Sequence, residues 1–146
     1  MSEEKLAFCS QAWVDYARSY LQRASANADL SGVSVTFNEV FTDAPSELDH
    51  DSDGRVGWYL RVHDGKLEVD RGILEAADLR ITADYATTLP LARMVFSGNP
   101  DSVQEAARLV VVATEAGKMH RDGDEGVLAT LPWLVKLHDV LAERTA

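Results

Sequence analysis

The chain has 146 residues, of which 46% are apolar and 26% charged, a composition typical of globular proteins and not of disordered chains. This length fits one domain, spanning 1–146, with a single hydrophobic core. The 14 basic and 24 acidic residues give a formal net charge of −10. Because nucleic acids and anionic membranes both attract positively charged proteins, we expect neither as a partner.

The sequence carries no signal for secretion or membrane insertion. Its longest apolar run covers residues 109–113, far short of the ~20 residues of a membrane-spanning helix. The first residues, Met1–Lys5, are acidic where a signal peptide would be basic. Cys9 is the only cysteine, so no intrachain disulfide can form. We therefore expect a cytoplasmic protein without stable membrane insertion.

The first part of the chain changes from a helical pattern to a strand pattern. Apolar residues recur every three or four positions over residues 3–25, which predicts an amphipathic N-terminal helix. Cys9 lies on the apolar face of this pattern, so we expect it to be a buried core side chain. From residue 33 apolar and polar residues alternate, which predicts a half-buried strand over 33–41.

Two further alternating segments, 56–62 and 66–70, flank the dipeptide Asp64-Gly65. A type I′ turn needs a positive φ at both of its central residues, and Asp-Gly meets this requirement. The pattern therefore predicts a β-hairpin. A fourth strand, which looks antiparallel like the others, is predicted over 79–83.

Helical spacing returns after Asp84. Leu89 and Phe96 share one face of a first predicted helix, in which Pro90 must occupy the first turn or introduce a kink. A second helix is predicted from Asn99 to Ala116, because Asn-Pro is a typical helix start.

A short fifth strand is predicted over 118–122, and a last helix after Asp124 with an interruption near Pro132. Strands in one block followed by helices in another are typical of an α+β fold. We expect an antiparallel sheet covered on one face by helices.

Motifs for metal binding or catalysis are weak. Residues 49–54 match the first half of a calcium loop, but Leu60 stands where the pattern requires a bidentate Glu, which favours a solvated acidic turn. The histidines lack the spacing of a metal site; they are His50, His63, His120 and His138. Phosphate-binding loops, dinucleotide fingerprints and nucleophile motifs are not found. We expect no metal, no cofactor and no enzymatic activity.

Two segments of the second half, 103–114 and 127–141, are apolar on more than one helical face. Such helices are buried on two sides or line an apolar space. The pattern leaves two interpretations open. One is an ordinary core or a homodimer face, and the other is a cavity for a fatty or sterol-like ligand.

Three segments together resemble the sterol carrier protein type 2 family, in the form of its stand-alone bacterial members. They are an aromatic strand with an Asp-Gly-Lys turn (57–69), an Ala-Asp strand start (77–84), and a Gly-Lys…Gly-Asp block (117–124). The resemblance covers about residues 30–140. It implies a five-stranded, mostly antiparallel sheet packed with helices around an apolar tunnel. It also implies non-catalytic binding of sterols, fatty acids, acyl-CoAs or phospholipids. The helix over 99–116 is longer than the family pattern requires and is expected to cap or fill this tunnel.

The leading hypothesis is therefore a carrier that buries an apolar ligand without making or breaking bonds. We expect its lining from strand and helix residues, with Met119 closing one end; the set is Trp58, Leu60, Val62, Leu89, Phe96, Leu109, Met119, Leu131 and Leu134. One alternative is an interaction module with a filled core that dimerises or assists a biosynthetic enzyme. Another is an enzyme that uses an acid such as Asp84 or Asp124.

Overall fold

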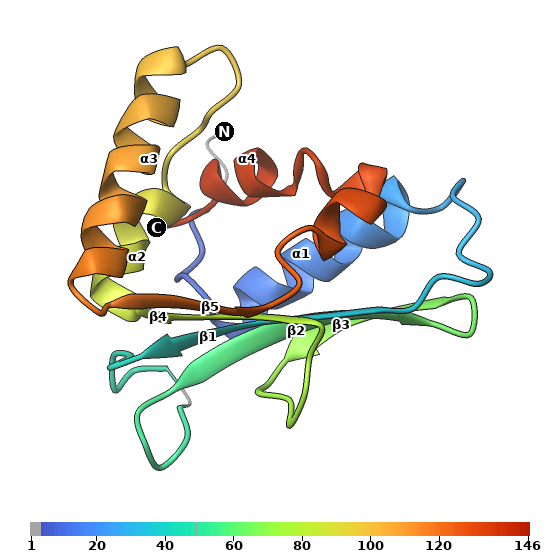
Figure 1. The fold of residues 1–146 in the computed structure, drawn as a ribbon, viewed down its shortest axis with the longest axis horizontal. Helices are drawn as coiled ribbons and strands as arrows, with labels where there is room; N and C mark the ends of the chain where they lie inside the picture. Colours follow the sequence, from blue (N-terminus) through green and yellow to red (C-terminus); the bar gives the residue numbers. More distant parts are fainter. Residues whose placement is uncertain (1–3, 49) are drawn as a thin grey trace.

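The structure is a computed structural model that describes residues 4–48 and 50–146. It has two layers, a five-stranded sheet and a set of helices that all cover the same face of that sheet (Figure 1). The strands are β1 (Val35–Thr42), β2 (Val56–His63), β3 (Lys66–Arg71), β4 (Leu79–Asp84) and β5 (Met119–Gly123). The predicted α+β fold is confirmed.

The sheet has the strand order β3-β2-β1-β4-β5. Strand β1 pairs with β4 in parallel, and the other three pairings are antiparallel. The sheet is therefore mostly antiparallel, as predicted, but the fourth strand is antiparallel only to β5 and not to β1. The chain completes the β2–β3 hairpin on one side of β1 and then crosses to its other side through residues 72–78, so β4 runs in the same direction as β1. Alternation predicts a strand but does not identify its partner.

The hairpin between β2 and β3 is confirmed. Asp64 has φ 52° and Gly65 has φ 73°, which are the two positive values that a type I′ turn requires. The register places His63 opposite Lys66 and Trp58 opposite Arg71. This local turn fixes the register between β2 and β3, and a shift by one residue would turn every side chain of β3 to the opposite face.

The helical layer contains four α-helices and two short 3₁₀ turns in the described residues. They are α1 (Gln11–Ala24), α2 (Tyr85–Ala92), α3 (Pro100–Glu115), η1 (Val127–Thr130), η2 (Pro132–Leu134) and α4 (Leu137–Ala142). In Figure 1, α1 lies across the sheet, whereas α3 rises away from the sheet at the side of β4 and β5. None of the described helices is long and apolar enough to cross a lipid bilayer.

Helix α1 begins later than its apolar pattern predicts. Residues 4–10 are not helical, because Cys9 has φ 60° and Ser10 caps the helix with its hydroxyl oxygen 3.2 Å from the Trp13 backbone nitrogen. Leu6 instead forms a parallel bridge with Thr145. Cys9 is fully buried, as predicted, and burial raises the pKa of its thiol to about 12.

The helices after β4 also differ in detail from their predictions. Helix α2 ends at Ala92, two residues after Pro90, so Phe96 lies in the following loop and not on the helix. The last predicted helix is divided into η1, η2 and α4, and the break at Pro132 occurs where it was predicted.

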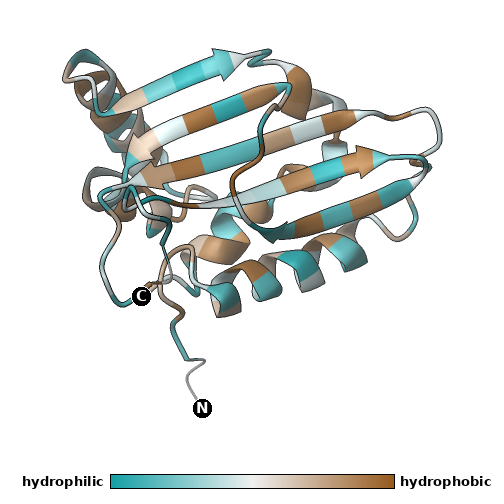
Figure 2. Cartoon of the chain, turned by 90° about the horizontal axis from the view of Figure 1, so that it is seen from below, coloured by the Kyte–Doolittle hydropathy of each residue, from teal (hydrophilic) through white to brown (hydrophobic). Residues whose placement is uncertain are grey.

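The core lies between the helices and the sheet. Viewed from below, the strands alternate between hydrophilic and hydrophobic residues (Figure 2), so the sheet presents one set of side chains to the helices and another away from them. Asn38 is a polar residue of β1 that is fully buried, on the side of the sheet away from the helices. Its side-chain amide donates to the carbonyls of Trp58 (2.8 Å) and Gly72 (3.2 Å) and accepts from the Leu74 nitrogen (2.9 Å).

Candidate ligand-binding site

A pocket of about 740 Å³ opens between the sheet and the helices. Every helix, both 3₁₀ turns and all strands except β3 contribute to its wall. Four lining residues are polar or charged, namely Glu39, Thr88, Arg121 and His138, and the others are apolar. A pocket of this size with few polar groups is typical of sites for small apolar ligands.

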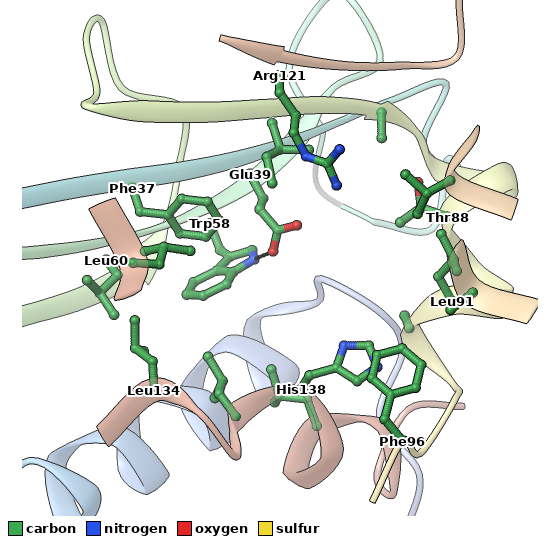
Figure 3. Close-up of a pocket in the computed structure, with 18 of the residues that line it drawn as sticks. Phe37, Glu39, Trp58, Leu60, Thr88, Leu91, Phe96, Arg121, Leu134 and His138 are labelled. Carbon is green, nitrogen blue, oxygen red and sulfur yellow. Dashed lines mark hydrogen bonds between the residues drawn. The ribbon is translucent and has the colours of Figure 1, made fainter. Parts of the chain in front are cut away.

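The floor of the pocket is a row of side chains across four strands. Glu39 of β1 is in register with Trp58 of β2 and with Ile81 of β4, and Ile81 is in register with Arg121 of β5. Residues paired in this way project from the same face of a sheet. The row therefore places one acid and one base on an otherwise apolar floor (Figure 3).

Glu39 is the buried acid of the pocket. Its Oε1 atom accepts a hydrogen bond from the Trp58 indole nitrogen at 2.9 Å. Protein atoms surround the side chain, although it remains partly accessible because it borders the pocket. Burial raises the pKa of this carboxyl to about 7, and the Trp58 hydrogen bond and the positive charge of Arg121 oppose the increase. Glu39 thus exchanges its proton close to neutral pH.

Arg121 connects the pocket with the surface. It lies on the edge strand β5, and its side chain is 40% exposed. The Arg121 Nε atom is 3.8 Å from Oε1 of Glu125. Among the described residues no basic group lies within the 4.0 Å of a salt bridge to Glu39. The charge of Arg121 therefore acts on Glu39 without a direct ion pair.

The wall opposite the sheet is held together by contacts between the loop after α2 and helix α4. The rings of Phe96 and His138 are stacked, with centroids 4.2 Å apart and planes at 1°. His138 Nε2 lies 2.8 Å from the Met94 carbonyl oxygen, and the Asp139 carboxylate accepts from the backbone nitrogen of Phe96 at 2.7 Å. These contacts fix two aromatic rings at the pocket wall (Figure 3).

Comparisons with solved structures support the fold. A conserved hypothetical protein of Thermus thermophilus, named as a candidate sterol carrier protein, has a TM-score of 0.51 at 16% identity, covering 99% of this chain and 94% of that protein. A crystal structure of sterol carrier protein 2 has a TM-score of 0.50 at 18% identity, covering 94% and 99%. The chain has the sterol carrier protein 2 fold. No protein-family model matches the sequence, and no curated protein matches it.

The pocket of this sterol carrier protein 2 fold brings together most of the predicted lining residues. Six of the nine line it, namely Trp58, Leu60, Phe96, Met119, Leu131 and Leu134. Val62, Leu89 and Leu109 do not. Val62 is fully buried and lies two residues beyond Leu60 on β2, past the end of the pocket.

Leu89 and Leu109 lie outside the pocket because of their positions around their helices. Successive residues of an α-helix are rotated by about 100°. Val110 lines the pocket, whereas its neighbour Leu109 packs against the core from another direction. On α2 the same relationship separates Leu89 from Thr88. Helix α3 forms part of the pocket wall through Ala106, Ala107 and Val110.

Sequence reasoning missed the two charged residues on the floor. Glu39 continues the alternation of Phe37 and Phe41, so its position on an apolar face could have been found from the sequence. Arg121 shares the phase of Met119 in β5. That the two charges face the same pocket follows only from the strand order, which no local pattern predicts.

The acids proposed for catalysis have structural contacts outside the pocket. Asp84 caps α2 by accepting from the Thr87 nitrogen at 2.9 Å, and Asp124 accepts from the Gly126 nitrogen at 3.0 Å. In the acidic loop, Asp49 lies outside the described residues. Asp51 accepts from Arg55 in that loop, with a side-chain contact of 2.9 Å.

Proposed function

We propose that this protein binds and carries an apolar ligand of the fatty acid, sterol-like or other lipid class in its pocket, without catalysing a reaction. The observation that carries the proposal is the pocket of about 740 Å³ with an almost entirely apolar lining. The named function of the sterol carrier proteins that share the fold gives further support. As the site of action we propose the cytoplasm, an expectation that rests on the sequence alone.

Binding would be driven by removal of the ligand's hydrocarbon from water. Each buried methylene contributes about 0.8 kcal/mol, so a chain of a dozen carbons contributes roughly 9 kcal/mol before the entropic costs of binding. Trp58, Phe96 and Leu131 provide apolar contact surface from the sheet, the loop after α2 and the segment between η1 and η2.

Mass spectrometry of the purified protein tests the proposal. Under native conditions we expect a bound species that leaves on denaturation and is recovered by solvent extraction. A protein that has no bound species and binds no alkyl-chain ligand when it is titrated would contradict the proposal.

A second candidate function is a protein-interaction surface, for which exposed apolar side chains provide a specific observation. Val111 and Val112 on α3 are 54% and 51% exposed, and Val135 is 82% exposed. Adjacent exposed apolar side chains such as the two valines of α3 are typical of contact surfaces. Val135 follows η2 and borders the pocket. Sedimentation velocity tests this candidate. A homodimer that is lost on Val112→Ser substitution would support it, and a monomer at all concentrations would contradict the dimer.

A further inference from the structure

We propose that Glu39 selects ligands whose polar end is an uncharged hydroxyl over ligands whose polar end is an ionised carboxylate. This inference rests on the proposed function, because it concerns the polar end of a ligand held in the same pocket. The apolar lining contacts the hydrocarbon part of a ligand and does not distinguish polar head groups. We therefore assign the selection among lipid classes to Glu39.

The first argument is the geometry of Glu39. The side chain reaches into the pocket from the central strand of the sheet (Figure 3). Trp58 donates to Oε1, and no other hydrogen bond to this carboxyl is formed within the described chain. One carboxylate oxygen is therefore available as an acceptor inside the pocket. Glu39 is half-buried and borders the pocket, so a ligand that fills the pocket takes this oxygen out of contact with water and leaves it unpaired unless the ligand brings a donor.

The second argument is the charge around that acceptor. Arg121 is the charged group that faces Glu39 from β5, and it lies beyond salt-bridge distance while contacting Glu125. The thiol of Cys9 also interacts electrostatically with Glu39, and it stays neutral at physiological pH because burial raises its pKa to about 12. His138 lines the opposite wall, where its ring contacts Phe96 and the Met94 carbonyl. The negative charge of an ionised Glu39 is therefore only partly compensated.

These two arguments separate the ligand classes. A ligand carboxylate would be attracted by Arg121, but beside Glu39 it would meet a like charge in a region of low dielectric, where such repulsion is strong. A hydroxyl can donate to the free Glu39 oxygen and can also accept a hydrogen bond from the Arg121 guanidinium. An ammonium group would pair with Glu39 but would be repelled by Arg121. The hydroxyl is the head group that suits both residues.

The test compares 1-dodecanol with dodecanoate, which share a chain length, by titration of the purified protein at about pH 8. At this pH both the ligand carboxyl and Glu39, with its pKa of about 7, are mostly ionised. We expect wild-type protein to bind 1-dodecanol at least about tenfold more tightly than dodecanoate. In Glu39→Gln, which keeps an oxygen for the Trp58 hydrogen bond and removes the charge, dodecanoate should gain about tenfold. Glu68→Gln is the matched control, since Glu68 lies on β3 outside the pocket, and it should leave both affinities unchanged.

Equal affinity of wild-type protein for the two ligands would overturn the inference while leaving the proposed function in place. So would tighter binding of dodecylammonium than of 1-dodecanol, or an unchanged preference in Glu39→Gln. If neither ligand binds, the inference fails, and the proposed function fails with it when native mass spectrometry also finds no bound species. If the variant does not fold, equal affinity of wild-type protein for the two ligands still overturns the inference.

Discussion

The indole nitrogen of Trp58 lies 2.9 Å from Oε1 of Glu39, so a hydrogen bond joins the side chains of two neighbouring strands on the floor of the pocket. The two residues are opposite each other in the β1–β2 register, which positions the bond through the sheet itself. Because Glu39 is an acid on an apolar floor, it affects the stability of the protein, and its own protonation affects which ligands bind.

Glu39 should make the stability of the protein depend on pH. Its pKa rises from 4.5 in the unfolded chain to about 7 in the folded protein, so the folded state binds the proton more tightly. The contribution of Glu39 to stability therefore falls as pH increases from about 4.5 to about 7 and then stays level. Glu39→Gln should be more stable than wild type by up to about 3 kcal/mol at pH 8 and equal to it near pH 4. Urea unfolding at the two pH values measures this difference, and a variant that is less stable at pH 8 would contradict it.

Trp58→Phe should raise the pKa of Glu39 above about 7. The indole N–H stabilises the ionised carboxylate, and phenylalanine cannot donate this hydrogen bond. Carbon-13 NMR of the labelled Glu39 carboxyl during a pH titration measures the change. Trp13→Phe serves as the control, because the Trp13 indole donates to Thr145 (3.1 Å) and not to Glu39. A Glu39 pKa that stays the same or falls in Trp58→Phe would refute the assigned role of the indole.

Asn38→Ala should destabilise the protein by about 2–4 kcal/mol, because it leaves the buried partners of this amide without a hydrogen bond. Thermal or urea unfolding measures the loss. Asn99→Ala provides a comparison, since Asn99 is exposed and its side-chain amide donates only to the Val95 carbonyl among the described residues. A cost below about 1 kcal/mol is expected there. Similar costs for the two variants would argue against Asn38 as a link between β1 and the segment after β3.

Gly123→Ala should cost about 3 kcal/mol or more and loosen the edge strand that carries Arg121. Gly123 has φ 116°, and a Cβ atom there would lie 2.0 Å from the Asp78 carbonyl oxygen. Gly117→Ala is the matched variant, because its φ of 73° is also positive but a Cβ atom would meet nothing within 4 Å. We expect about 1 kcal/mol for this second change. Unfolding measurements that rank the two variants in the opposite order would contradict this account of β5.

The elements that the sequence predicted well depend on local chemistry. The Asp64-Gly65 turn was predictable because both positive φ values are set by two adjacent residues. Helix α3 begins at Pro100, as its Asn-Pro start predicts. Helix α1 was predicted too long because its apolar pattern continues into residues that pair with the C-terminal segment through the Leu6–Thr145 bridge.

The pocket was less predictable, because it depends on which strands and helices become neighbours. Apolar periodicity identifies a buried face but cannot separate a residue that fills the core from one that borders an open space. Leu109 and Val110 illustrate this limit, since both are half-buried residues of α3 and only Val110 lines the pocket. The pairing of β1 with β4, which brings Glu39 and Arg121 to one floor, has a long sequence separation and no local signal.

Val110 and its neighbour Leu109 provide the most direct test that the pocket holds the ligand. Val110→Trp would fill part of the pocket, whereas Leu109→Trp adds a large side chain to the same helix outside the pocket wall. Each displaced methylene costs about 0.8 kcal/mol, so the loss of two reduces affinity about tenfold. We predict that Val110→Trp weakens binding of a twelve-carbon ligand by at least about tenfold, while Leu109→Trp stays within about twofold of wild type. Circular dichroism would show whether each variant is folded. A folded Val110→Trp protein that binds as tightly as wild type would contradict the account.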